Sequence, residues 1–198
     1  VGNDYAPLGN RDYSVIVDKM AKSDADGIAV IVTGNDAVTF LKQSGQVGLN
    51  KSKTQFGPVL QDETLAAAVG PAAVGVYSGV RYHFTVDNPA NKKFVEAYRA
   101  KYNEWPSSFA GEAYDGISWW LDVVESTKSW DRETWVDAFA KSTRENSLEG
   151  KKVMRGCDHQ AAQVGLWGVV TEGQAPLPPL TMKITDVFDA SKLFDVCS

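Results

Sequence analysis

The chain has 198 residues and a formal net charge of −5, and 43% of its residues are hydrophobic while 23% are charged. This ordinary globular composition excludes intrinsically disordered and collagen-like proteins, and an acidic balance without basic stripes argues against a nucleic-acid-binding protein. The sequence holds no run of about 18 apolar residues, so it predicts no membrane-spanning helix.

The first half of the chain alternates predicted helices and strands. Asp12 is suited to cap a helix that runs to about Lys22. The apolar run over 27–32 is rich in β-branched residues, as in a strand that is buried on both faces of a parallel sheet. There follow a helix over 37–46, a strand over 54–60, a short helix after Asp62 and a strand over 74–82. This alternation predicts an α/β fold with parallel strands and right-handed crossovers.

The second half is predicted to be helical before it returns to strands. Asn88 and Pro89 suit the cap and the first position of one helix, and Ser108 can cap a longer helix. A third helix is predicted over 132–141, and short strands over 153–154, 164–170 and 180–184. The longer helix has a predicted apolar face made of Ala110, Ala113, Tyr114, Ile117, Leu121 and Val124. Three consecutive helices indicate that the chain leaves one α/β lobe near residue 85 and returns near residue 150.

The two cysteines, Cys157 and Cys197, match no metal-binding or redox motif, so no metal site is predicted. Two interpretations remain: two buried free thiols, or one disulfide in an exported protein. Cys197 is next to the last residue, where a tether is more useful than a buried thiol, and this favours a Cys157–Cys197 disulfide. In the chain-entropy model, closing so long a loop stabilises the fold by about 3–4 kcal/mol.

Short segments of the chain recur in the order that one known family has. They are residues 9–14 (GNRDYS), 32–37 (VTGNDA), 40–43, 47–49, 75–77, 88–94 (NPANKKF), 98–102, 106–107 and 113–115. Together they resemble the solute-binding proteins of ABC importers of the branched-chain amino acid type, which have the type I periplasmic binding protein fold. Residues 154–160 (MRGCDHQ), with a cysteine near the C-terminus, resemble the subgroup that binds aromatic acids and related small carboxylates.

The resemblance implies an α/β fold of the type I periplasmic-binding-protein kind, with a parallel sheet, flanking helices and only part of the two lobes. Family members are about twice as long, and this chain resembles their C-terminal half. We expect residues 1–84 to form lobe two without its N-terminal part, 85–148 to be helices of lobe one, and 149–198 to return to lobe two and a C-terminal tail. The missing N-terminal portion of the same protein is an expected partner, because its absence leaves unpaired strand edges and an exposed apolar helix face.

The resemblance also implies a function without catalysis or cofactor. Such a protein captures a small carboxylate in the periplasm or extracellular space, in a cleft that closes between the lobes, and presents it to an ABC permease. The cleft groups come from loops at the carboxyl ends of parallel strands. Pro58 stands where the amino-acid binders carry an acidic residue, which favours an aromatic or keto acid over a branched-chain amino acid.

The candidate ligand-binding residues are Asn35, Asp36, Gln61, Tyr82 and Tyr114. Each has a structural alternative. Asn35 or Asp36 can cap the helix that follows, and Gln61 can be a solvent-facing loop residue. Tyr82 can pack in the core or at the hinge, and Tyr114 can pack in the core. Asp115, beside Tyr114, is expected to be a buried ion-pair partner or a hinge contact.

Two other functions remain open. Type I binding folds also serve as ligand-binding sensor domains of receptors. Cys157 and His159 share a face of an extended strand and could form the thiolate–imidazole pair of a thiol-dependent enzyme. A disulfide at Cys157 would abolish that pair, and the sequence contains no G-x-S-x-G, P-loop or H-E-x-x-H motif. We therefore expect a protein that is not an enzyme.

Overall fold

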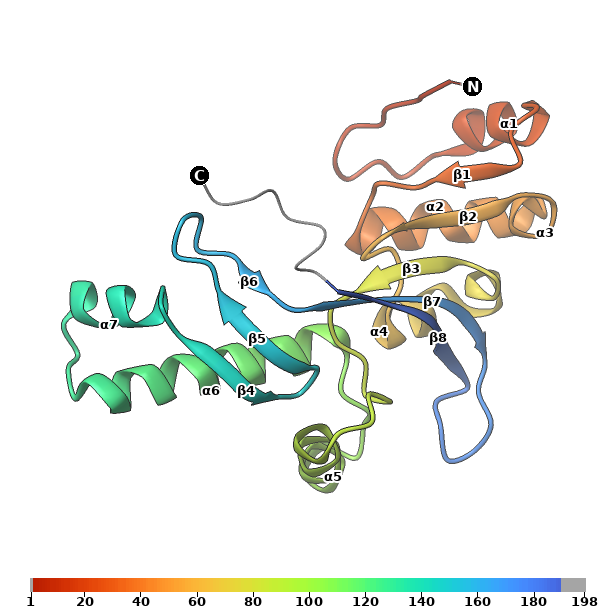
Figure 1. Cartoon of the computed structure of the whole chain (residues 1–198). Helices are drawn as coiled ribbons and strands as arrows, with labels where there is room; N and C mark the ends of the chain where they lie inside the picture. The colour runs from red at the N-terminus through yellow and green to blue at the C-terminus, as the bar shows by residue number, and fades with distance from the viewer. Residues whose placement is uncertain (1, 190–198) are drawn as a thin grey trace. The chain divides into compact units, whose positions relative to one another are not determined.

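A computed structural model describes residues 2–189 of the chain (Figure 1). The described residues divide into two compact units. Unit 1 contains residues 2–80 and 167–186, and unit 2 contains residues 81–166 and 187–189. None of the helices in this described part is long and apolar enough to cross a membrane.

Unit 1 is built on a five-stranded sheet with the order β1-β2-β3-β7-β8. The strands are β1 (Gly27–Ala29), β2 (Thr54–Pro58), β3 (Tyr77–Val80), β7 (Val164–Glu172) and β8 (Leu180–Asp189). The first three strands run parallel, with Ile28 beside Gln55 and Phe56 beside Tyr77. Helices connect these strands along the chain. The predicted α/β fold with parallel strands is confirmed.

The helices of unit 1 enclose its hydrophobic core against the sheet. They are α1 (Ser14–Lys22), α2 (Gly34–Gln46), α3 (Leu49–Ser52), α4 (Glu63–Val69) and the 3-10 helix η1 (Gly70–Ala73). Val17 of α1, Leu41 of α2 and Ala66 of α4 belong to one buried cluster with residues of the strands. Asp62 caps α4, because its Oδ1 accepts a hydrogen bond from the Leu65 N–H at 2.9 Å.

One expectation for unit 1 is wrong: the run over 27–32 is not buried on both faces. The strand ends at Ala29, and burial alternates, with Ile28 and Val30 in the core while Ala29 is exposed and Ile31 is 71% exposed. Alternation is the pattern of a sheet that is covered on one face. Among the described residues, the core cluster covers the face that carries Ile28 and Val30.

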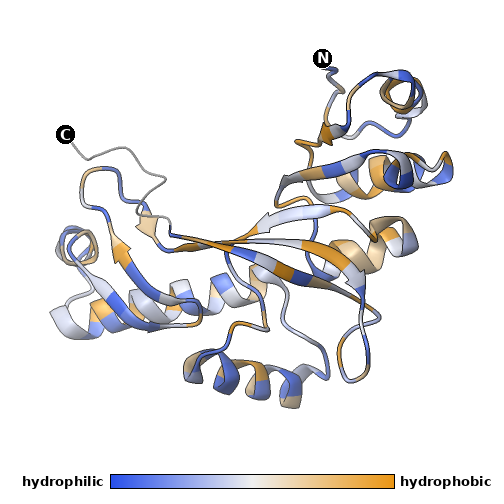
Figure 2. Ribbon diagram, turned by 45° about the vertical axis from the view of Figure 1, so that its right-hand side comes forward, coloured by the Kyte–Doolittle hydropathy of each residue, from blue (hydrophilic) through white to orange (hydrophobic). Residues whose placement is uncertain are grey.

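The described residues of unit 2 form three helices and a small antiparallel sheet. The helices are α5 (Pro89–Tyr102), α6 (Ser108–Thr127) and α7 (Arg132–Phe139), and the strands are β4 (Thr143–Ser147), β5 (Gly150–Met154) and β6 (Ala161–Ala162). Asn88 caps α5, as predicted, by accepting from the Asn91 N–H at 2.8 Å. Ser107 rather than Ser108 caps α6. In Figure 2, hydrophilic and hydrophobic residues alternate along α5 and α6, as expected of helices that are buried on one side.

Of the predicted apolar face of α6, only Val124 is buried in the described structure. Tyr114 is 52% exposed, and Ile117 and Leu121 are exposed as well. The helix instead buries Gly111, Asp115, Trp119 and Val123. The reason lies in the partners within unit 2, because the Tyr82 ring packs on Gly111 and the Phe139 ring lies 4.8 Å from the Trp119 ring.

Two expectations stay predictions. The first is the assignment of residues 1–84, 85–148 and 149–198 to lobes, because these lobes are defined for the longer chains of family members. The Cys157–Cys197 disulfide involves Cys197, which lies outside the described residues.

Candidate ligand-binding site

The two loops predicted to bind ligand leave the sheet of unit 1 at the same edge. Because β1 and β2 are parallel, with Ala29 beside Phe56, residues 30–36 and 59–62 both start at the carboxyl ends of their strands. The Val30 N–H donates to the Phe56 carbonyl oxygen at 2.8 Å, so the pairing continues one residue beyond β1. This edge is where open α/β sheets bind their ligands.

Asn35 and Asp36 lie in the first turn of α2, after a left-handed residue, Gly34, with φ of 59°. The cap position is Thr33, so the alternative that Asn35 or Asp36 caps the helix is wrong. Asn35 is exposed. Asp36 is half-buried, and its Oδ2 accepts from the Gly9 N–H at 3.0 Å. Asn35 therefore has the more accessible side chain of the two.

Gln61 is fully buried, so the alternative of a solvent-facing loop residue is wrong. Its backbone N–H donates to Ser78 Oγ at 2.9 Å, and its Nε2 donates to the Leu60 carbonyl oxygen at 2.8 Å. Gln61 Oε1 has no hydrogen-bond partner among the described residues. A direct ligand contact through this side chain would need the loop to rearrange.

The exposed surface of these loops offers neutral groups. Pro58, the last residue of β2, is exposed. Of the carboxylates in the two loops and at the start of α4, Asp36 is half-buried and bonded to a backbone N–H, while Asp62 and Glu63 are buried. A cationic ligand group would thus meet no fully exposed carboxylate on this part of the described surface.

The two candidate tyrosines belong to unit 2 and differ in accessibility. Tyr82 is fully buried, donates its hydroxyl to Asn91 Oδ1 at 2.9 Å and lies edge-on to Phe94. It serves the core of unit 2, as its structural alternative supposed. Tyr114 is half-exposed, and its ring lies 4.5 Å from the Phe94 ring.

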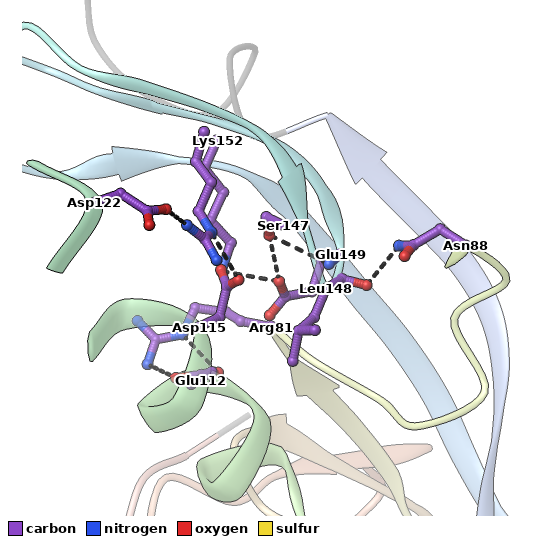
Figure 3. A network of polar contacts seen from close by, with 10 residues as sticks. Arg81, Asn88, Glu112, Asp115, Asp122, Ser147, Leu148, Glu149 and Lys152 are labelled. Atoms are coloured by element: carbon purple, nitrogen blue, oxygen red, sulfur yellow. Dashed lines mark hydrogen bonds and ion pairs between the residues drawn. The ribbon is translucent and has the colours of Figure 1, made fainter. Parts of the chain in front are cut away.

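Asp115 is a fully buried ion-pair partner, as one of its two interpretations supposed, and it joins a network of charged groups whose other members the sequence did not indicate (Figure 3). Its Oδ1 accepts from Arg144 Nε at 3.0 Å, and its Oδ2 lies 2.7 Å from Lys152 Nζ. Lys152 Nζ also lies 2.8 Å from Glu149 Oε2, and Arg144 pairs with Asp122 as well. The network ties α6 to the β4–β5 hairpin. The sequence did not indicate that Glu149 and Lys152 of the hairpin are buried and Arg144 mostly so, because charged residues in short strands are usually exposed.

The pKa values of the two buried carboxyl groups in this network, Glu149 and Asp115, are shifted in opposite directions. Burial raises the pKa of Glu149, and the attraction of Lys152 only partly offsets it. Burial also acts to raise the pKa of Asp115, but the hydrogen bond and charge of Lys152 with the charge of Arg144 together hold it below its usual value.

Glu149→Gln should gain stability relative to the wild type as the pH rises from 4 to 7. The raised pKa of Glu149 means that its stabilising contribution is complete below its ordinary value of about 4.5 and is lost as the pH rises through the folded-state pKa. The glutamine amide of the variant does not ionise, so the variant does not lose this stability. Urea unfolding at both pH values measures the difference. Glu145→Gln, at an exposed pair with Lys151, is the control, and an equal pH dependence in both variants would contradict the prediction.

The proposed thiol–imidazole geometry is wrong. Residues 156–158 form a turn, and His159 has a left-handed φ of 57°, so the alternation of an extended strand does not apply to Cys157 and His159. Across residues 2–189, no three histidine, cysteine or acidic residues are placed to hold a metal ion.

Comparison with known families decides the classification. The family model described as periplasmic binding protein matches residues 1–174. The chain belongs to the periplasmic binding protein family. This family is not enzymatic, and membership implies an extracytoplasmic location.

Relatives of this periplasmic binding protein chain agree with the predicted type. It is 35% identical over 126 residues to Leu/Ile/Val-binding protein homolog 6 of Brucella melitensis. The aligned residues cover 61% of this chain and 32% of that protein. It superposes on a solute-binding protein of an ABC transporter from Rhodopseudomonas palustris BisB5, in complex with 3,4-dihydroxybenzoic acid, with a TM-score of 0.81 and 26% identity. It also superposes on the leucine-binding protein LivK of Thermotoga maritima, with a TM-score of 0.77 and 23% identity.

These matches also define the extent of the resemblance. The two superpositions each cover 93% of this chain and 50% of the solved chain. The periplasmic binding protein chain thus spans about a third of the length of its curated relative and about half the length of the solved ones. The resemblance to the branched-chain amino acid type, limited to half of the fold, is confirmed.

Proposed function

We propose that this chain is the ligand-binding part of an extracytoplasmic solute-binding protein that captures a small carboxylate and presents it to an ABC permease. The match of the family model over residues 1–174 carries this proposal. The placement of two loops at the carboxyl edge of a parallel sheet supports it. Nothing in the described residues favours the sensor alternative.

We propose an aromatic or keto acid as the ligand rather than an amino acid. An α-ammonium group that leaves water needs an anionic or strong hydrogen-bonding partner. Pro58 is uncharged, and the nearby carboxylates are buried or already bonded. The 26% identical relative that holds 3,4-dihydroxybenzoic acid supports this class, while the name of the Brucella relative keeps a branched-chain amino acid as the second candidate.

Asn35 is the proposed hydrogen-bond donor to the ligand from unit 1. Its side chain is exposed at the start of a 13-residue helix, whose first backbone N–H groups have no partner within the helix and attract carboxylates. Asp36, Gln61, Tyr82 and Tyr114 are weaker candidates, since Asp36 bonds a backbone N–H, Gln61 and Tyr82 are buried, and Tyr114 packs on Phe94.

Tight binding is further proposed to need the half of the fold that the solved relatives have in addition to the matched half. One lobe by itself leaves its ligand in water, where hydrogen bonds to the protein replace equally good bonds to solvent. Native mass spectrometry of the purified protein tests this directly. A complementary polypeptide bound to the chain supports the proposal, and micromolar binding by a lone chain overturns it.

Calorimetric titration of the species that native mass spectrometry identifies tests the ligand class. We expect 3,4-dihydroxybenzoate or benzoate to bind at least tenfold more tightly than leucine. Asn35→Ala should weaken that binding about tenfold, the effect of losing one hydrogen bond to a charged group. Asn3→Ala, at another exposed asparagine, is the control. Tighter binding of leucine would overturn the ligand class. No binding of any small carboxylate by the chain in complex with its complementary polypeptide would overturn the function.

A further inference from the structure

The loop between β2 and α4 contains a strained residue. Val59 has a φ of 50°, in the left-handed region. That region is costly for a β-branched side chain, and a residue stays there only where its surroundings hold it. Glycine would adopt the same backbone conformation without this cost. The strain therefore directs attention to the groups that hold the loop.

Two neighbouring residues of β3 hold the loop. The Val59 N–H donates to the Gly79 carbonyl oxygen at 2.8 Å. The Gln61 N–H donates to Ser78 Oγ at 2.9 Å, and both residues are fully buried. The first contact uses backbone alone, whereas the second depends on one hydroxyl group. The side chain of Gln61 is folded onto the Leu60 carbonyl oxygen, so it leaves the backbone N–H to Ser78.

The conformation of the loop decides what the sheet edge presents. Leu60, Gln61 and Asp62 are buried, so Pro58 and Val59 are the loop residues that reach the surface. A turn of Val59 out of the left-handed region would bring the buried residues toward solvent and move Pro58. The buried Ser78 hydroxyl therefore influences which loop residues are exposed, although it is not itself exposed.

We infer that Ser78 is a positioning residue for ligand binding: its hydroxyl holds the β2–α4 loop through Gln61 and so keeps Val59 in the conformation that shapes the binding edge. This inference rests on the proposed function for its consequence, but the hydrogen bond and the strained residue are properties of unit 1 alone.

Ser78→Ala leaves the buried Gln61 N–H without its acceptor, and an unpaired buried donor is costly. We expect the amide hydrogen exchange of Gln61, measured by NMR, to rise at least tenfold, and the Val59 backbone coupling constant to leave the left-handed range. Ser44→Ala is the matched control, because Ser44 is also fully buried in unit 1 and bonds Gln55. It should leave Gln61 exchange within twofold. Unchanged Gln61 exchange in Ser78→Ala overturns the inference.

Ligand affinity separates positioning from general stability. With 3,4-dihydroxybenzoate as the probe, Ser78→Ala should weaken binding at least fivefold and Ser44→Ala less than twofold. In a Val59→Gly background, where the left-handed conformation costs nothing, Ser78→Ala should weaken binding less than twofold. Equal losses in Ser78→Ala and Ser44→Ala, or no rescue by Val59→Gly, overturn the inference. If the wild-type chain in complex with its complementary polypeptide binds no probe, the proposed function fails, and the exchange measurement alone decides whether Ser78 holds the loop.

Discussion

Replacing Asp115 by alanine is expected to destabilise unit 2 by about 3–5 kcal/mol, the cost of breaking a buried ion pair from one side. Asp115 is fully buried and lies between Arg144 Nε and Lys152 Nζ. Without it, the buried Lys152 ammonium keeps only Glu149 as an ion-pair partner, and the pKa of Glu149 is already raised by burial. One of the two carboxylates that balance its charge is then missing. The hairpin formed by β4 and β5 should then separate from α6.

Asp122→Ala is the matched control for this prediction. Asp122 lies on the same helix and pairs with the same Arg144, but 66% of its side chain is exposed. Exposed ion pairs contribute about 0–1 kcal/mol, so little stability should be lost. Urea unfolding followed by tryptophan fluorescence measures both variants, because Trp105, Trp119, Trp120, Trp130 and Trp135 all lie in unit 2. Similar losses in the two variants would show that burial does not set the strength of this network.

Gly111→Ala is expected to destabilise unit 2 by about 2–3 kcal/mol, although alanine is the better helix former by about 1 kcal/mol. A Cβ atom at Gly111 would lie far inside van der Waals contact with the ring of Tyr82. That ring cannot move away easily, because Tyr82 is fully buried, bonded to Asn91 and packed edge-on to Phe94. The helix would have to shift or the ring would have to leave its position.

Gly116→Ala, five residues further along α6, is expected to stabilise unit 2 instead of destabilising it. No heavy atom lies within 4 Å of a Cβ built at Gly116, so only the gain in helix propensity remains, about 0.5–1 kcal/mol. Thermal and urea unfolding of both variants checks the pair. Destabilisation by Gly116→Ala, or a neutral Gly111→Ala, would mean that the close approach of Tyr82 does not limit the packing of α6.

Local signals in the sequence predicted much of the fold because they depend on near neighbours. Asn88 before Pro89 marked the start of α5, and Asp62 marked the start of α4. The alternation of apolar runs with helical segments indicated parallel strands, which the pairing of β1, β2 and β3 confirms. Short segments in the order of one family indicated the family to which the chain belongs.

The candidate site was less predictable. Gln61 was placed on a strand-end loop, but nothing in the sequence indicated that the backbone turns inward at Val59 and buries its side chain. The sequence did not indicate a role for Ser78, because a single serine in a strand has no distinctive pattern. Helical spacing predicts an apolar face on α6, but spacing cannot tell which side of the helix meets Tyr82 and Phe139.

The sequence by itself determined the α/β class, the parallel connection of the first strands and the family to which the chain belongs. Only the tertiary structure decided that Asp115 is balanced by Arg144 and Lys152, and that Ser78 holds the loop at Val59. The physical reason is range. Caps, turns and hydrophobic periodicity act within a few residues, whereas these pairings join residues 17 to 37 positions apart and exist only once the strands have taken their places.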